Sequence, residues 1–116
     1  MKHGNKIKKF KRETDQRHAL MRSLARALIL NESIVTTEAK AKALRPFIEP
    51  LITRAKENTL ANRRLVEARL GKADVARKLF ATIAPRYVDR KGGYTRVVKM
   101  APVAGRGKKE AVIAFV

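Results

Sequence analysis

Apolar residues recur at helical spacing near the start of the chain. Three leucines lie four residues apart: Leu20, Leu24 and Leu28. Thr14-Asp15 before them is typical of a helix N-cap, and Asn31 after them tolerates the left-handed conformation that often follows a helix. The pattern predicts a helix from this cap to about Asn31, with the leucines facing the core.

The same stretch carries a second stripe, which is basic. Its members also lie four residues apart: His18, Arg22 and Arg26. They are two positions from the leucines, which is about 200° around the helix. The stripe therefore predicts a basic face opposite the core. A general base at His18 is the alternative, and the two arginines beside it favour contact with a nucleic-acid backbone.

Three further helices are predicted. One covers 38–57 and contains Pro46 and Pro50, which predict a kink or break because proline lacks a backbone donor and crowds the preceding turn. The next begins at Asn58-Thr59 and runs to Gly71. The last covers 72–84 and should end at Pro85.

Three short segments have the pattern of β-strands. Ser33–Thr37 is β-branched, and Thr37 should cap the next helix. Tyr94–Met100 follows a Gly92-Gly93 turn. Residues 111–116 are apolar on both faces, which predicts a central or covered strand. The expected fold is α+β, with about four helices on a small mixed sheet of about three strands.

Charge changes this picture most. Lys and Arg number 28 and Asp and Glu 10, giving a net charge of +18 over 116 residues. Such a body repels itself unless a polyanion screens it, and nucleic acid is the commonest polyanion. An anionic membrane surface is the alternative, although no stretch approaches the roughly 20 apolar residues of a membrane span.

The first twelve residues form a basic run without an acid. Its bases are Lys2, Lys6, Lys8, Lys9, Lys11 and Arg12, with His3 among them. Such a segment has little to bury, so we expect a flexible arm over 1–12 that orders on nucleic acid, followed by one globular domain over 13–116. A solvated tail is the alternative. No apolar run follows the arm, so it does not resemble a secretory signal, and the expected location is cytoplasmic.

Catalysis is not expected. The ten acids are scattered along the chain, mostly at predicted helix starts and on exposed helix faces, where capping and surface pairing explain them. There is no cysteine, and two histidines are too few for a zinc site built on histidine, so we expect no metal site. We also expect no cofactor and no small-molecule substrate. Gly105-Arg106-Gly107-Lys108 lacks the spacing of a phosphate-binding loop.

Four bases and two aromatic residues surround the Gly92-Gly93 turn. They are Arg86, Tyr87, Arg90, Lys91, Tyr94 and Arg96. Guanidinium groups grip phosphate oxygens, tyrosine rings stack on unpaired bases, and glycines let a backbone approach phosphates. The alternative is an ordinary strand entry with the tyrosines in the core. For Arg63-Arg64, binding and an ordinary helix surface remain equally open.

The predicted RNA contacts are a single set. They are Lys2, His3, Lys6, Lys8, Lys9, Lys11, Arg12, Arg17, His18, Arg22, Arg26, Arg63, Arg64, Arg86, Arg90, Lys91, Gly92, Gly93, Tyr94 and Arg96.

Several motifs, in order, resemble the bacterial large-subunit ribosomal protein seventeen family. They are Met1-Lys2-His3, Arg17-His18-Ala19, Ile34 with Thr36-Thr37, Ala39-Lys40-Ala41-Lys42, Glu49-Pro50-Leu51-Ile52, Ala61-Asn62-Arg63-Arg64-Leu65, Pro85-Arg86-Tyr87 and Gly92-Gly93-Tyr94-Thr95-Arg96. The resemblance covers nearly the whole chain. It implies an α+β fold, and assembly on large-subunit ribosomal RNA near the nascent-chain exit region, beside other ribosomal proteins. The family varies in length and charge over residues 101–110, so the resemblance implies least about that loop.

Two other classes share the charge. A DNA-binding architectural protein would carry the same basic excess. A cationic membrane-active protein would use the opposed leucine and arginine stripes of the first helix, but the rest of the chain offers enough apolar residues to bury that leucine stripe.

Overall fold

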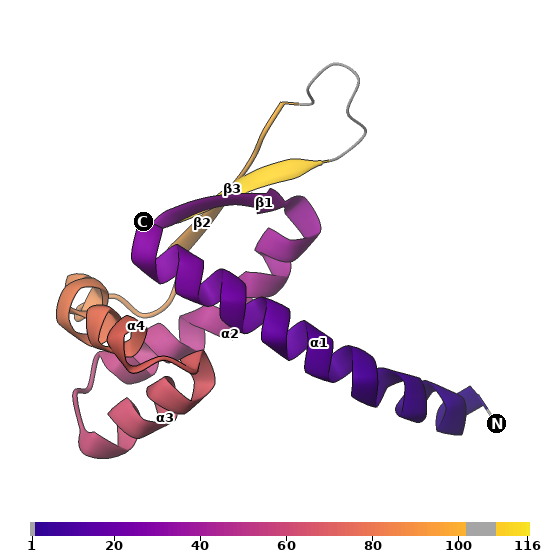
Figure 1. Ribbon diagram of the computed structural model, residues 1–116. Helices are drawn as coiled ribbons and strands as arrows, with labels where there is room; N and C mark the ends of the chain where they lie inside the picture. The colour runs from indigo at the N-terminus through magenta and orange to yellow at the C-terminus, as the bar shows by residue number, and fades with distance from the viewer. Residues whose placement is uncertain (1, 102–108) are drawn as a thin grey trace.

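The computed structural model describes the backbone of residues 2–101 and 109–116, and within these ranges the side chains from residue 14 onward. The elements run in this order: α1 (Lys2–Asn31), β1 (Ser33–Thr37), α2 (Glu38–Ala55), α3 (Leu60–Leu70), α4 (Ala73–Lys78), the π-helical turn η1 (Leu79–Ile83), the 3-10 turn η2 (Ala84–Tyr87), β2 (Thr95–Lys99) and β3 (Glu110–Phe115). Helices pack on a small sheet, as predicted, and α1 extends beyond the other helices (Figure 1).

The first helix is longer than predicted. Its bounds include Thr14-Asp15, so the predicted cap lies inside it. No glycine or proline lies between Lys6 and Thr14 to end a helix, and lysine, arginine and glutamate there are good helix formers. The helix ends at Asn31 as predicted, but the left-handed residue is Glu32 (φ 64°), not Asn31. The side chains of the predicted arm lie outside the described residues.

The sheet is antiparallel throughout, with strand order β1-β3-β2. The expectation of a mixed sheet was wrong in this detail. The strands β1 and β2 run parallel to each other, but β3 lies between them and pairs antiparallel with both. The prediction of a central strand near the C-terminus is confirmed.

One face of the sheet is packed against the helices. Ile34, Ile113 and Val97 are in register across the three strands and contact the core. The opposite face carries Val35 and Val98, which are exposed on either side of Val112.

The helix α2 is the centre of the fold, because it contacts all three strands as well as α1 and α3. Six of its residues are buried: Ala41, Leu44, Ile48, Leu51, Ile52 and Ala55. Thr37 caps it as predicted, its Oγ1 accepting from the Lys40 N–H at 3.3 Å. Pro46 and Pro50 lie inside one continuous helix. Both prolines are exposed, and so is Lys42, whose carbonyl group loses its helical donor at Pro46.

The next helices also follow local signals. Thr59 caps α3 by accepting from the Asn62 N–H, and Gly71 ends it with φ 76°. The predicted helix over 72–84 changes character after Lys78, passing through η1 and then η2 to Tyr87. Pro85 does not end the helical segment. It lies in the first turn of η2, where the missing backbone N–H of proline costs no helical hydrogen bond.

Substituting Gly71 by alanine should destabilise the fold by about 1–2 kcal/mol, because a β-carbon is strained in left-handed backbone. That carbon would also lie 3.2 Å from the Arg26 Nη1 atom, which holds the end of α3. Urea unfolding would measure the loss. Gly71→Asn should cost less, because asparagine tolerates this conformation; equal stability of Gly71→Ala and wild type would contradict the argument.

Candidate nucleic-acid interface

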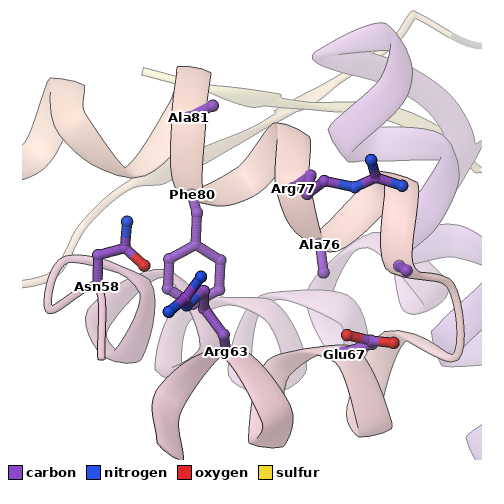
Figure 2. Close-up of a pocket in the computed structure, with 8 residues that line it drawn as sticks. Asn58, Arg63, Glu67, Ala76, Arg77, Phe80 and Ala81 are labelled. Atoms are coloured by element: carbon purple, nitrogen blue, oxygen red, sulfur yellow. The ribbon is translucent and has the colours of Figure 1, made fainter. Parts of the chain in front are cut away.

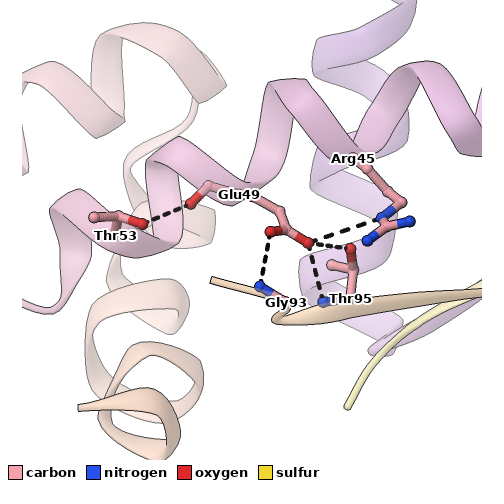
Figure 3. Close-up of polar contacts among 5 residues, drawn as sticks. All are labelled: Arg45, Glu49, Thr53, Gly93 and Thr95. Carbon is pink, nitrogen blue, oxygen red and sulfur yellow. Dashed lines mark hydrogen bonds and ion pairs between the residues drawn. The ribbon is translucent and has the colours of Figure 1, made fainter. Parts of the chain in front are cut away.

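The Gly92-Gly93 segment is held by one carboxylate of α2. Glu49 Oε1 accepts from the Gly93 N–H at 3.2 Å, and Oε2 accepts from the Thr95 N–H at 3.3 Å and the Thr95 hydroxyl at 2.7 Å. Figure 3 shows these bonds, with Arg45 Nε 3.9 Å from Oε2. Both glycines have positive φ (84° and 66°), as the predicted turn requires. The Gly93 N–H therefore already has a carboxylate partner, which counts against its use for a phosphate.

The two tyrosines belong to the core. Tyr94 is 1% exposed and Tyr87 3%, and their rings lie 5.2 Å apart between centroids. The Tyr87 hydroxyl donates to the Val116 carbonyl at 2.7 Å, and the Tyr94 hydroxyl donates to the Arg90 carbonyl at 3.2 Å. The prediction that Tyr94 contacts RNA was wrong for its ring, because a buried ring cannot stack on a base. The core alternative holds for both tyrosines.

The bases of this segment differ in what they contact. Arg86 donates a hydrogen bond to Glu32 and forms an ion pair with it. Arg90, Lys91 and Arg96 are exposed, and among the described residues their side chains have no ion-pair or hydrogen-bond partner. These three side chains are therefore the ones that this segment leaves available for phosphate.

The Glu32–Arg86 pair makes stability depend on pH. The pKa of Glu32 is lowered, chiefly by the hydrogen bond from Arg86. A carboxyl group with a depressed folded-state pKa stabilises the fold above its unfolded pKa and loses this contribution as pH falls through the folded pKa.

We therefore expect the stability difference between wild type and Glu32→Gln to be constant well above the ordinary glutamate pKa of 4.5 and to shrink as the pH falls below it, through the lowered folded-state pKa. Urea unfolding across this range measures it. An equal difference in the free energy of unfolding at both ends of this range would contradict a lowered pKa for Glu32.

The basic stripe of α1 is only partly open. Arg26 donates from Nη1 to the Leu70 carbonyl at 3.1 Å, and Arg22 lies beside Gly71, so both are half-buried against the end of α3. The prediction of an open basic face opposite the core was wrong at Arg22 and Arg26, because the end of α3 packs against these two side chains. Arg17 and His18, nearer the N-terminus, are exposed.

The two adjacent bases of α3, Arg63 and Arg64, lie in different surroundings. Arg64 and Gly71 line one shallow hollow, which places Arg64 near the half-buried arginines of α1. Arg63 instead lines a separate pocket together with Phe80 and Arg77 (Figure 2). Sequence reasoning missed Phe80 and Arg77. Phe80 lies next to the buried stripe of its helix, so its spacing predicts a core residue.

Known proteins resemble this chain along its whole length. A profile of the family described as Ribosomal protein L17 matches residues 20–116. The large ribosomal subunit protein bL17 of Hydrogenobaculum sp. (strain Y04AAS1) is 52% identical, over 100% of this chain and 99% of that relative. The chain belongs to the ribosomal protein L17 family. The resemblance stated from the sequence is thus confirmed.

Two other relatives are longer than this chain. The protein of the same name from Erythrobacter litoralis (strain HTCC2594) is 48% identical, over 100% of this chain and 83% of the relative. That of Salinibacter ruber (strain DSM 13855 / M31) is 50% identical, but this chain spans only 59% of its length.

Membership in the L17 family confirms the expectation that the chain is not an enzyme, since this is a family of ribosomal proteins. The described side chains include no group of three or more His, Cys, Asp or Glu residues that could hold a metal ion. In the same part of the chain, no helix has the length and apolar character needed to cross a bilayer.

Proposed function

We propose that this protein is a structural constituent of the large ribosomal subunit and binds its ribosomal RNA. Relatives that match the full chain are named as proteins of that subunit. The observation that carries RNA binding is unbalanced charge. The chain has 28 Lys and Arg, and the four ion pairs between described residues have only Glu32, Glu38 and Glu49 as their acidic partners.

The interface has three parts. The basic arm over 1–12 precedes the domain over 13–116 and carries six Lys and Arg. Near the start of the described side chains of α1, Arg17 and the stripe residue His18 are exposed and form the second part. Beside the Gly92-Gly93 turn, Arg90, Lys91 and Arg96 offer three more cations.

These parts recognise RNA mainly by its shape and its phosphates. The described segment beside the glycine turn exposes cations, while its tyrosines are buried. Side chains cannot read the deep, narrow major groove of A-form RNA, so cations that follow the backbone suit this partner. Within the cytoplasmic ribosome, the protein then lies near the nascent-chain exit region and beside other ribosomal proteins. Only the family resemblance supports this location.

A competition experiment tests the proposal. Labelled protein would be bound to large-subunit ribosomal RNA at about 0.15 M salt and challenged with unlabelled ribosomal RNA or with duplex DNA of equal phosphate content. Ribosomal RNA should compete far better, and the protein should remain on large subunits through a high-salt gradient. Equal competition by duplex DNA would favour the architectural alternative, and absence from washed subunits would overturn the proposal.

A further inference from the structure

An open pocket lies between α3 and the segment formed by α4 and η1. Its volume is about 300 Å³, which is at the lower end of small-ligand sites. Phe80 projects into it from η1 and Arg63 from α3, with Asn58 beside them (Figure 2). Most of the rest of the wall is alanine, including Ala81. The pocket therefore combines an aromatic ring with a polar rim.

The position of Phe80 follows from the π-helical turn. Ala84 donates its N–H to the Leu79 carbonyl, five residues back, so η1 is wider than an α-turn. Leu79 and Ile83 are buried on one side, whereas Phe80 remains half-buried at the pocket. Single π-turns within helices are frequent at functional sites, because they change where a side chain points.

The rim carries more positive than negative charge. Arg63 and Arg77 are exposed, and neither has an ion-pair or hydrogen-bond partner among the described side chains. Glu67 is the acid of the rim. Asn58 is exposed and offers both an amide donor and an acceptor. An occupant that suits this rim has a flat apolar body, a polar edge and negative charge on either side.

We propose that the pocket takes an unpaired base of the bound RNA. The base stacks on Phe80, its edge bonds to the Asn58 amide, and Arg63 and Arg77 contact the flanking phosphates. This inference rests on the proposed RNA-binding function. A buried apolar side chain of a neighbouring protein would fill the same space, but it would leave both guanidinium groups without an anion, so the charge favours a nucleotide.

Blocking the pocket tests the proposal without removing Phe80 from its core contacts. Ala81 is exposed and lines the pocket, so Ala81→Gln fills the entrance without changing the net charge. Ala61→Gln is the matched control, because Ala61 is exposed on α3 outside the pocket. Ala81→Gln should weaken binding of the full-length protein to large-subunit ribosomal RNA by about five- to a hundredfold. Ala61→Gln should bind like wild type.

Ultraviolet crosslinking of the same complexes locates the base. Mass spectrometry should find a nucleotide attached at Phe80 in wild type and in Ala61→Gln, and much less in Ala81→Gln. If all three proteins bind RNA equally and Phe80 carries no nucleotide, the pocket proposal fails while RNA binding stands. If Phe80 becomes inaccessible only in whole subunits and carries no nucleotide there, a neighbouring protein covers it, and the proposal is overturned. If wild type binds no ribosomal RNA, both proposals fail.

Discussion

Replacing Lys8, Lys9 and Lys11 by glutamine should make binding to ribosomal RNA much less sensitive to salt. Each lysine that neutralises a phosphate releases about 0.7–0.9 counterion, so three lysines contribute a slope of about two to three in log affinity against log salt. Between about 50 and 200 mM salt, that slope corresponds to a roughly twenty- to fortyfold decrease in affinity. Filter binding over this range measures it.

A variant of the domain provides the matched control. Lys40, Arg54 and Lys72 are exposed bases outside the proposed interface, and their replacement by glutamine removes the same charge. The slope should then change little. If both triple variants lower it equally, the attraction depends on total charge and the arm has no special role. Thermal unfolding of both variants checks that the fold is intact.

Glu49→Ala should destabilise the fold by about 2–4 kcal/mol, because hydrogen bonds to a charged group are stronger than neutral ones. The change leaves the Gly93 N–H and two donors of Thr95 without their partner, and Thr95 is only 4% exposed. Urea unfolding measures the loss. RNA affinity should also fall, because Arg90 and Lys91 would no longer be held by an ordered turn.

Glu57→Ala separates this effect from the change in net charge. Glu57 is exposed just beyond α2, and its side chain makes no hydrogen bond or ion pair with a described residue. Any destabilisation through added self-repulsion should therefore appear in both variants. Equal losses for Glu49→Ala and Glu57→Ala would show that the three hydrogen bonds contribute nothing measurable.

Local signals predicted most of the secondary structure. The strand Ser33–Thr37 and the caps at Thr37, Thr59 and Gly71 are set by residues within one or two turns of each other. The central position of β3 followed from its apolar residues on both faces. Such features need no knowledge of the tertiary fold, because the residues that decide them are neighbours in the sequence.

Contacts between distant residues could not be predicted in this way. The Arg26 guanidinium bonds to Leu70, and Glu49 bonds to Gly93 and Thr95, across 44 or more residues. The same basic or acidic residue in the sequence could equally face solvent. The burial of Tyr94 and the pocket at Phe80 likewise depend on how helices pack, so spacing alone could not distinguish core from interface.

The strand order has a consequence for how the protein is made. Synthesis proceeds from the N-terminus, so β3 follows every other described element out of the ribosome, although it occupies the middle of the sheet. Until it arrives, β1 and β2 cannot pair with it, and each has an open edge that invites aggregation. Maturation of the fold therefore waits for its final strand, and a nascent chain stopped before Glu110 should be an early substrate for proteases.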